Sequence, residues 1–316
     1  MPVNSNKPHL WKNDIAVSVD FYNNWFMSFA PKAYRETRQQ TTEQVRQTLE
    51  LTRDLTLLTP NIFRQNPTIL PTLRMSTAPP VARDRLIGLA YVSKSLVVSM
   101  EKGKIPSRMS SALLDQQLEA IAEILLKLFD YDIFPWLELR MQPSDVERQR
   151  AATIIADRLC GTMTDPIIRN AQEQRQLAVI DQYLKRQGYI KMTHNANLSL
   201  AKMQPGTYNF RMNVVVGDER AVNMPIDVVI QPHQPNPGGL PILIEAKSAG
   251  DFTNTNKRRK EEATKINQLR RRYGEEVKFI LFLGGYFDGG YLGYEAAEGI
   301  DWVWEHRIED LDQLGI

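Results

Sequence analysis

Hydrophobic residues in the first half of the chain recur with the spacing of amphipathic helices. The clearest stripe consists of Leu114, Leu118, Ile121, Leu125 and Leu128, whose intervals of three and four residues return to one face of a helix. Such a stripe predicts a helix with one buried face. Together with several helix-start signals, it predicts that the first 150 residues are mainly helical.

Polar residues mark where several helices are expected to begin and end. Thr41-Thr42-Glu43-Gln44 resembles a capping box and predicts a helix to about residue 56, and Ser144 with Glu147 predicts another to about residue 159. Asp165-Pro166 predicts a third helix start, with Asp as the N-cap and Pro at the first helical position. Gly188 predicts the end of that helix.

The second half of the chain changes to short apolar runs that are typical of strands. The predicted strands are residues 208–216, 222–230, 240–247, 277–283 and 302–306, and a charged helix is predicted over residues 256–273. This order predicts an α/β fold with a mixed central sheet flanked by helices. We therefore expect a mainly helical N-terminal region over residues 1–155 and an α/β core over residues 156–316.

Composition and charge exclude several classes of protein. The 39 Lys and Arg residues nearly balance the 37 Asp and Glu residues, so any nucleic-acid surface must come from local clusters of positive charge. One cysteine, Cys160, and four scattered histidines exclude a disulfide framework and a thiolate zinc site. The longest apolar run, residues 279–287, is far shorter than the roughly 20 residues that span a bilayer. We expect a cytoplasmic, soluble protein.

The strongest chemical signal comes from charged residues on two neighbouring apolar strands. Asp227 lies among apolar residues of the first strand, and Glu245 and Lys247 point to one face of the second because side chains alternate along a strand. If a hairpin places Ile230 opposite Leu240, Asp227 becomes the diagonal neighbour of Glu245, at roughly 7–8 Å between backbones. One hard divalent cation can bridge the two carboxylates.

These three residues fit metal-dependent hydrolysis of a phosphodiester. Burying charged groups on apolar strands is costly unless something compensates them, and Mg²⁺ prefers carboxylate oxygens and retained waters. A bound cation acidifies a water molecule and screens the phosphate, while Lys247 would orient or deprotonate that water and stabilise the pentavalent state. The alternative is an exposed strand face with a Glu–Lys pair, which is the usual meaning of an isolated Glu-x-Lys.

Glu173 is a candidate for a third acidic group. It shares a helix face with Leu177, Ile180 and Leu184, because the spacings of four, three and four return to the same angle. A carboxylate on that buried stripe could hold a metal-bound water or a second ion. The alternative is an ordinary charge near a helix N-terminus, where the macrodipole favours it.

A polar and basic segment follows the second strand directly. Its candidate DNA contacts are Ser248, Asn254, Thr255, Asn256, Lys257, Arg258, Arg259 and Lys260. Hydroxyl and amide groups suit phosphates or base edges, and the cations suit phosphates. The alternative is a solvated charged helix, which the Glu261 to Lys265 spacing also favours.

A second candidate DNA-binding element lies in the helical half. Residues 86–103 read like a helix-turn-helix with its turn at Val92-Ser93, which would present Ser93 and Lys94 to a major groove. Arg83 and Arg85 flank it and could read guanines. The alternative is plain helix packing.

Asp227 together with Glu245-Ala246-Lys247 resembles the PD-(D/E)XK nuclease signature, although Ile226 separates Pro225 from the aspartate. Longer stretches resemble the XamI-type family of type II restriction endonucleases, from about Arg74 to the C-terminus. They read MSTAPPVARDRLIGLAYVSKSL, PIDVVIQP, LIEAKSAGDFTNTNKRRKEEATK and GYEAAEGIDWVWEHRI.

The resemblance implies a PD-(D/E)XK core and Mg²⁺-dependent cleavage of both DNA strands at a short palindrome. It places the motif positions at Asp227, Glu245 and Lys247. Our own interpretation is that Asp227 and Glu245 bind Mg²⁺, or Mn²⁺ in its place, with the Ala246 carbonyl as a third ligand, and that Lys247 serves the water with assistance from Glu173. The family's namesake is associated with the sequence GTCGAC. Cutting a palindrome predicts a homodimer, and a cognate DNA methyltransferase is the expected functional partner.

Two other functions remain open from the residues. A repair or recombination nuclease of the same fold would use the same chemistry but read DNA structure. A DNA-binding protein with a decayed nuclease core would lack cleavage, and the intact Asp227, Glu245 and Lys247 argue against it.

Overall fold

The computed structural model describes residues 2–192, 200–217, 221–235, 239–253 and 255–316, without the side chains of residues 201 and 255–258. The chain forms two compact units. The first consists of Met1–Phe29 and Ile168–Ile316, and the second of Ala30–Ile167. Two long helices, α1 (Pro8–Leu51) and α8 (Asp145–Arg186), contribute residues to both units.

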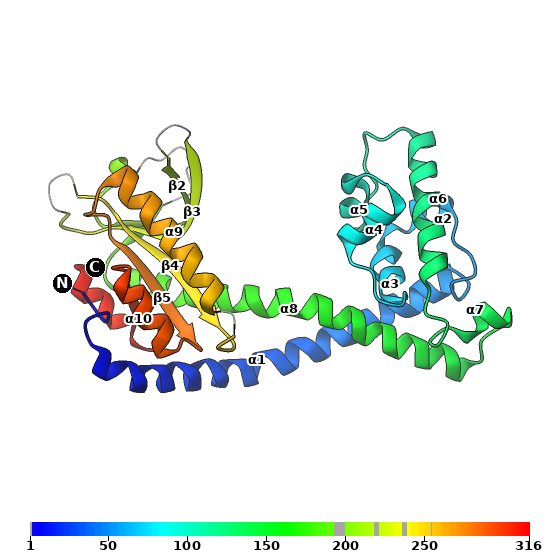
Figure 1. The fold of residues 1–316 in the computed structure, drawn as a ribbon, viewed down its shortest axis with the longest axis horizontal. Helices are drawn as coiled ribbons and strands as arrows, with labels where there is room; N and C mark the ends of the chain where they lie inside the picture. Colours follow the sequence, from blue (N-terminus) through cyan, green and yellow to red (C-terminus); the bar gives the residue numbers. More distant parts are fainter. Residues whose placement is uncertain (1, 193–199, 218–220, 236–238, 254) are drawn as a thin grey trace. The chain divides into compact units, whose positions relative to one another are not determined.

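The first unit is built on a six-stranded mixed sheet in the order β1 to β6 (Figure 1). The strands are β1 (Ile190–Lys191), β2 (Thr207–Val216), β3 (Val222–Gln231), β4 (Ile242–Ala249), β5 (Phe279–Gly285) and β6 (Asp301–Trp304). β2, β3 and β4 are antiparallel neighbours, whereas β4, β5 and β6 run parallel. Parallel neighbours need crossover helices, which α9 (Thr255–Tyr273) and α10 (Gly289–Ala297) supply.

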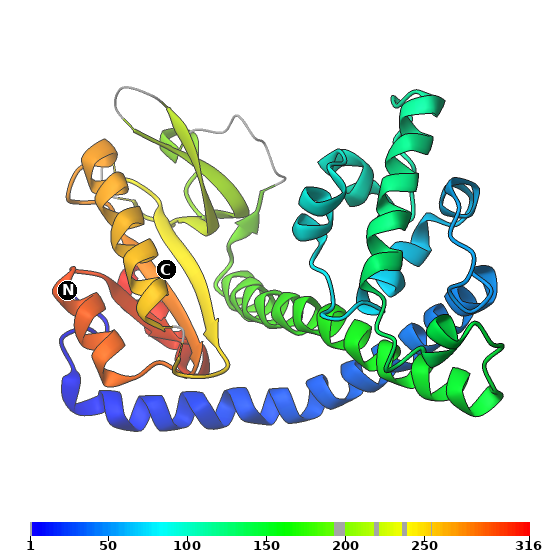
Figure 2. The same cartoon turned by 45° about the vertical axis from the view of Figure 1, so that its right-hand side comes forward.

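Helices cover both faces of this sheet. The α9 face buries Leu243, Leu281 and Trp302 with Ile266 and Leu269 of α9, and Figure 2 shows α9 lying along β4. The opposite, α8 face buries other strand residues against the C-terminal part of α8 and the 3-10 segment η3 (Glu305–Leu314). A short 3-10 turn, η2, spans Leu200–Lys202. The predicted strands, the predicted helix over residues 256–273 and the α/β fold class are confirmed.

The hairpin of β2 and β3 changes faces at one position. Tyr208 and Val228 pack on the α8 face, whereas Met212 and Ile226 pack on the α9 face. Between them Arg211 has a left-handed backbone, with φ of +52°. An irregular residue of this kind bends a strand and re-aims its side chains. The bend lies across from Asp227 in the β2–β3 register.

The N-terminal segment is part of the sheet unit. The Asp301 carboxylate at the start of β6 accepts the backbone N–H groups of Asn4 and Ser5 at 3.0 and 2.9 Å and also that of Val3. Val3 is fully buried. The structure thus groups the first 29 residues with the sheet, whereas the sequence division placed all of residues 1–155 in the helical region.

Two of the three predicted helix starts are wrong. Ser144 does cap α8, because its hydroxyl and backbone N–H both contact Glu147 Oε2 at 2.7 and 2.8 Å. Thr41, however, the N-cap of the predicted box, lies inside α1 and donates its hydroxyl to the Arg38 carbonyl at 3.1 Å instead of capping a helix. Pro166 likewise lies inside α8, which continues through it.

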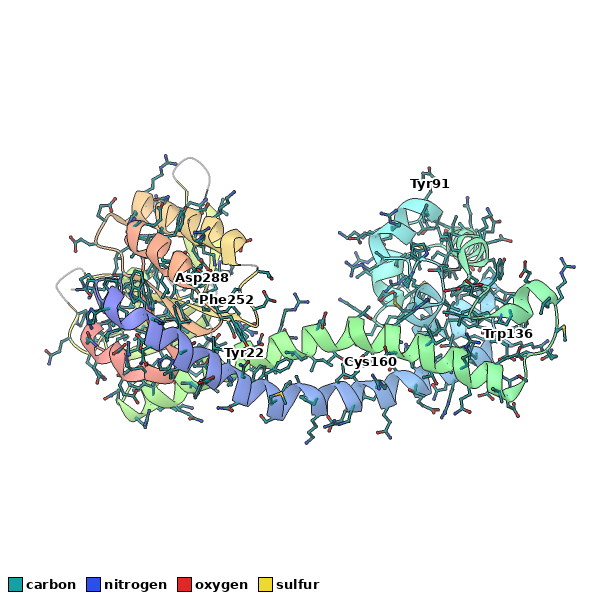
Figure 3. All side chains as sticks on the ribbon, turned by 60° about the horizontal axis from the view of Figure 1, so that its bottom comes forward. Tyr22, Tyr91, Trp136, Cys160, Phe252 and Asp288 are labelled. Carbon is teal, nitrogen blue, oxygen red and sulfur yellow. The ribbon has the colours of Figure 1, made fainter. Side chains whose placement is uncertain are left out.

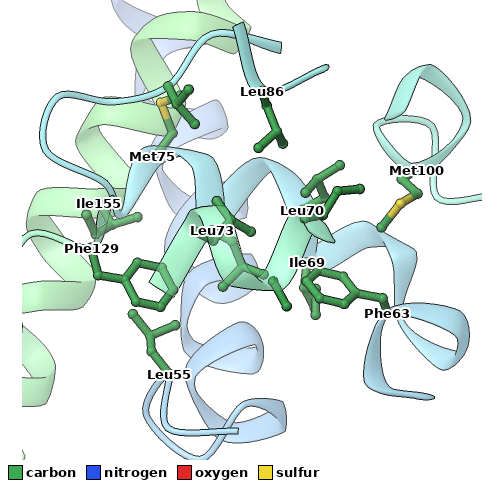
Figure 4. Packing of buried hydrophobic residues seen from close by; sticks show 14 of the residues in the cluster. Leu55, Phe63, Ile69, Leu70, Leu73, Met75, Leu86, Met100, Phe129 and Ile155 are labelled. Atoms are coloured by element: carbon green, nitrogen blue, oxygen red, sulfur yellow. The ribbon is translucent and has the colours of Figure 1, made fainter. Parts of the chain in front are cut away.

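The second unit is helical. It contains α2 (Pro60–Gln65), η1 (Pro67–Ile69), α3 (Leu70–Met75), α4 (Arg83–Ala90), α5 (Lys94–Met100), α6 (Ser111–Leu128) and α7 (Pro135–Leu139). The predicted stripe of α6 is confirmed for Leu114, Leu118, Ile121 and Leu125, which join the core that contains Leu73 and Phe129 (Figure 4), whereas Leu128 is half-buried. None of the described helices is long and apolar enough to cross a membrane.

We expect Asp301→Ala to release the N-terminal segment from the sheet unit. Losing one acceptor for several buried N–H groups costs about 1–3 kcal/mol of unfolding free energy. Denaturant unfolding measures this loss, and limited proteolysis should cut the variant within its first residues. Glu309→Ala, at an exposed position of η3, is the control. Equal stability of Asp301→Ala and wild type would contradict this account.

Candidate active site

Asp227 and Glu245 lie where two paired strands separate. The β3–β4 ladder pairs Ile230 with Ile242 and ends where Val228 pairs with Ile244. Continuing this register places Asp227 directly across from Glu245. The predicted register, with Ile230 opposite Leu240, is therefore wrong by two residues, because the connecting loop takes up more of the chain. The two carboxylates are direct rather than diagonal neighbours.

At this point the Asp227 carboxylate, in place of a backbone carbonyl, accepts a hydrogen bond from β4. Its Oδ2 accepts the backbone N–H of Ala246 at 2.9 Å. A hydrogen bond from the backbone to a side chain fixes the distance between the two strands after the regular pairing has ended. Asp227 and Glu245 thus lie at the position where β3 and β4 separate.

Glu245 is buried and contacts two lysines. Only 6% of the residue is exposed, and its Oε1 accepts from Lys247 Nζ at 3.1 Å and from Lys265 Nζ at 2.5 Å. Its Oε2 is buried and has no hydrogen-bond partner among the described residues. A carboxylate oxygen in that position is a natural ligand for a cation.

Lys247 contacts carboxylates on both sides. Its Nζ lies 3.1 Å from Glu245 Oε1 and 3.5 Å from Oε1 of Glu262 on α9. Burial alone lowers the pKa of Lys247, but Glu245 and Glu262 outweigh it and leave that pKa above its ordinary value. The ammonium group is therefore charged, which suits charge stabilisation and orientation of a water better than proton removal.

The surroundings of Asp227 destabilise its ionised form. Burial and, secondly, the nearby Glu245 carboxylate raise its pKa to about 6, although the Ala246 N–H and Lys247 act in the opposite direction. A carboxylate that is costly to ionise next to a second carboxylate gains most from a bound cation.

The donor set fits Mg²⁺. Among the described residues, no three Asp, Glu, His or Cys side chains come together as a metal cluster. Mg²⁺ does not require such a cage, because one or two carboxylates with waters are enough. Asp227 and Glu245 supply the carboxylates, and the buried Glu245 Oε2 is the oxygen that a cation would satisfy.

Glu173 is not brought into this cluster. It lies on α8, whose neighbouring residues Leu177 and Ile180 pack on the α8 face, whereas Glu245 and Lys247 contact α9. Its side chain is 39% exposed and pairs with Arg211 at 2.5 Å. A catalytic role for Glu173 stays a prediction.

Sequence reasoning missed Lys265, Glu262 and Gln176. Gln176 of α8 donates to the Lys247 carbonyl at 3.1 Å and so holds the end of β4. For Glu262 a signal was present, because it shares a helical face with Ile266 and Leu269, both buried. The spacing of Glu261 and Lys265 instead suggested a solvated pair. Spacing alone cannot show which face a charged helix buries.

The basic segment after β4 is only partly described. Asn254 and the side chains of Thr255, Asn256, Lys257 and Arg258 lie outside the described residues. Ser248 is half-buried at the end of β4, and Lys260 is exposed on α9. The Arg259 guanidinium stacks over the ring of Tyr294 at 4.8 Å. Aromatic side chains line the same end of the sheet, where Tyr286 packs between Phe252 and Tyr22 (Figure 3).

The predicted helix-turn-helix consists of two short helices, α4 and α5. Ser93 caps α5 by accepting the Leu96 N–H, and its hydroxyl donates to Gln117 Oε1 at 3.0 Å, so it has a structural role. Lys94 is exposed, as are Arg83 and Arg85. Tyr91 in the turn is 94% exposed and projects from the second unit (Figure 3). DNA reading by this element stays a prediction.

Known proteins resemble the chain over nearly its whole length. The sequence profile of the XamI restriction endonuclease family matches residues 53–304. The type II restriction enzyme SalI of Streptomyces albus G is 57% identical over 313 residues, 99% of each chain. Among solved structures, protein VC1899 from Vibrio cholerae aligns over 90% of this chain and 55% of its own, at 13% identity. Its TM-score of 0.29 is too low to indicate a common fold.

We expect Asp227→Asn to stabilise the metal-free protein at pH 8. The carboxyl pKa rises from 3.8 to about 6 on folding, so its favourable contribution is complete below pH 3.8 and disappears as the pH rises through 6. Because Asp227 is partly exposed, the gain at pH 8 should be about 1–2 kcal/mol, and it should shrink at pH 5. Denaturant unfolding in EDTA at both values measures it, with the exposed Asp20→Asn as control. A variant that is less stable than wild type at pH 8 would refute this.

Proposed function

The chain belongs to the XamI restriction endonuclease family and is a type II restriction endonuclease, and we propose that it cuts both DNA strands at a short palindromic sequence with Mg²⁺ as cofactor. The observation that carries this proposal is the joint placement of Asp227, Glu245 and Lys247. They meet at the point where β3 and β4 separate.

Asp227, Glu245 and the Ala246 carbonyl would hold Mg²⁺, and Mn²⁺ could replace it. The ion, when bound, supplies Lewis-acid polarisation of the scissile phosphate and acidification of water. The protein contributes the rigidity of the site. The Ala246 N–H holds Asp227, and Lys265 and Lys247 hold one oxygen of Glu245, which leaves the other oxygen for a ligand.

Lys247 would orient the attacking water and stabilise the pentavalent phosphate. Its ammonium group keeps its charge because two carboxylates surround it. A fixed positive charge in a partly buried site stabilises developing negative charge more than it would in water. Lys265 adds a second positive charge on the same side of Glu245.

DNA recognition would be divided between the two halves of the chain. We propose that residues 156–316 carry the nuclease core and that residues 1–155 contribute to recognition through α4 and α5. Ser248 follows Lys247 on β4, Arg259 and Lys260 lie on α9, and all three would suit phosphate contacts. Lys94, Arg83 and Arg85 are exposed and free of the core.

Cutting both strands of a palindrome requires two sites related by a two-fold axis, so we propose a homodimer. A cognate DNA methyltransferase would protect the host genome as a functional partner. The bacterial cytoplasm, where such a genome lies, is the proposed location.

We expect cleavage of unmethylated plasmid DNA into discrete fragments that requires both Mg²⁺ and Lys247. Lys247→Ala should lose at least about 100-fold in single-turnover rate, because a charge aimed at the transition state is removed. A duplex with GTCGAC is the first defined substrate to test, beside a duplex with a scrambled core. Sequencing the fragment ends would give the target and the cut position.

The other outcomes separate the alternatives. Cleavage confined to branched or damaged DNA would replace this proposal with a structure-specific nuclease. Metal-independent binding to one sequence without any cleavage would replace it with a DNA-binding protein.

We expect Lys94→Ala to weaken DNA binding by removing one phosphate contact. The slope of log affinity against log salt concentration should fall in magnitude by about 1, with little change in sequence preference. Lys127→Ala, at an exposed position of α6, is the matched control. Identical salt slopes for Lys94→Ala and wild type would exclude α5 from the interface.

A further inference from the structure

Glu262 is an acidic residue that is fully buried in the sheet unit. It lies on α9 and is 0% exposed, among Ile266, Leu269 and strand residues of the α9 face. A carboxylate in such surroundings is costly unless specific partners compensate it. Its partners therefore indicate what it does.

Two side chains contact the two oxygens of Glu262 separately. The Tyr291 hydroxyl of α10 donates to Oε2 at 2.8 Å, and Lys247 Nζ lies 3.5 Å from Oε1. The tyrosine thus holds one oxygen of the carboxylate in place. The other oxygen then faces the catalytic lysine, so a line of contacts runs from α10 through α9 to β4.

Glu295 of α10 belongs to the same buried group. It is 0% exposed, and no described donor reaches either of its oxygens, so a charged form would be unsolvated. Burial and, secondly, the neighbouring Glu262 carboxylate raise the pKa of Glu295 to about 9, so the group is neutral at pH 7–8. A neutral carboxyl can donate to Glu262 and leaves a single negative charge facing Lys247.

We propose that Glu262 is a positioning residue for Lys247, and that Tyr291 and Glu295 hold Glu262 in place. Lysine is long and flexible, and Glu245 alone would draw its ammonium group toward the metal ligands. A second carboxylate on the other side balances that pull and holds Nζ between Glu245 and Glu262. The inference rests on the proposed function, since it assigns a role relative to Lys247.

Glu262 acts on the lysine rather than as a third metal ligand. The described residues contain no cluster of three acidic, His or Cys side chains that could hold an ion, so Glu262 does not join Asp227 and Glu245 in one. Its described contacts include Lys247 Nζ at 3.5 Å and the Tyr291 hydroxyl at 2.8 Å.

The test is Glu262→Gln, which preserves shape and the acceptor for Tyr291 but removes the charge facing Lys247. We expect the single-turnover cleavage rate and kcat to fall about 10- to 100-fold, the usual effect of losing a partner that orients a functional group. KM and the DNA affinity measured without Mg²⁺ should stay within about twofold of wild type, because the DNA surface is untouched.

Three further variants separate positioning from folding. Glu295→Gln should keep near wild-type kcat, because an amide replaces a neutral carboxyl and still donates to Glu262. Tyr291→Phe should lower kcat by about 3- to 10-fold with unchanged KM. Glu261→Gln, the exposed neighbour on α9, should change nothing. Thermal unfolding of each variant checks that the fold is intact, and Tyr291→Phe carries the test if Glu262→Gln does not fold.

The outcomes are distinct. Wild-type kcat in folded Glu262→Gln, or a matching loss of DNA affinity, would overturn the positioning role while leaving the nuclease intact. Absence of Mg²⁺-dependent cleavage by wild-type protein would instead be a failure of the proposed function. Loss of kcat in Glu295→Gln equal to that in Glu262→Gln would show that Glu295 must be charged, which would also overturn the arrangement.

Discussion

The organisation of the sheet unit depends on the burial of carboxylates along one face of β3 and β4. Glu245 has 6% exposure and Asp227 lies opposite it, so their mutual repulsion and lost hydration must be offset within the protein. Lys247 and Lys265 offset part of it from β4 and α9, and the Ala246 N–H contributes a hydrogen bond. Protonation of Asp227, whose pKa is raised to about 6, relieves the remainder in the metal-free protein.

The backbone is irregular at the same place. The pairing of β3 with β4 ends at Val228, the neighbour of Asp227 in the chain. Arg211, whose backbone is left-handed, bends β2 at the position opposite Asp227. In a regular ladder the Asp227 side chain would stand roughly perpendicular to the sheet instead of reaching the backbone of β4. The bend also lets one hairpin pack its two ends on opposite faces of the sheet. Irregularities of this kind are typical beside active sites.

The charged helix α9 therefore serves two purposes. One face carries Lys260 and other exposed polar groups, and the other buries Glu262 with Ile266 and Leu269 against the sheet. Lys265 lies between them and reaches Glu245. α9 is the crossover that the parallel strands β4 and β5 require. The same helix also supplies side chains that contact Glu245 and Lys247.

Local patterns in the sequence determined the strands, the helix after β4, the stripe of α6 and the pairing of Asp227 with Glu245 and Lys247, because alternation and helical spacing act over a few residues. Tertiary structure decided the rest. Thr41 and Pro166 do not start helices, because two long helices continue through them. The hairpin register depended on a loop whose path no local rule specifies. Whether Glu173, Glu262 or Lys265 reaches Glu245 depends on which face each helix presents to the sheet. That is decided by packing between distant segments, since a charged helix can bury either side.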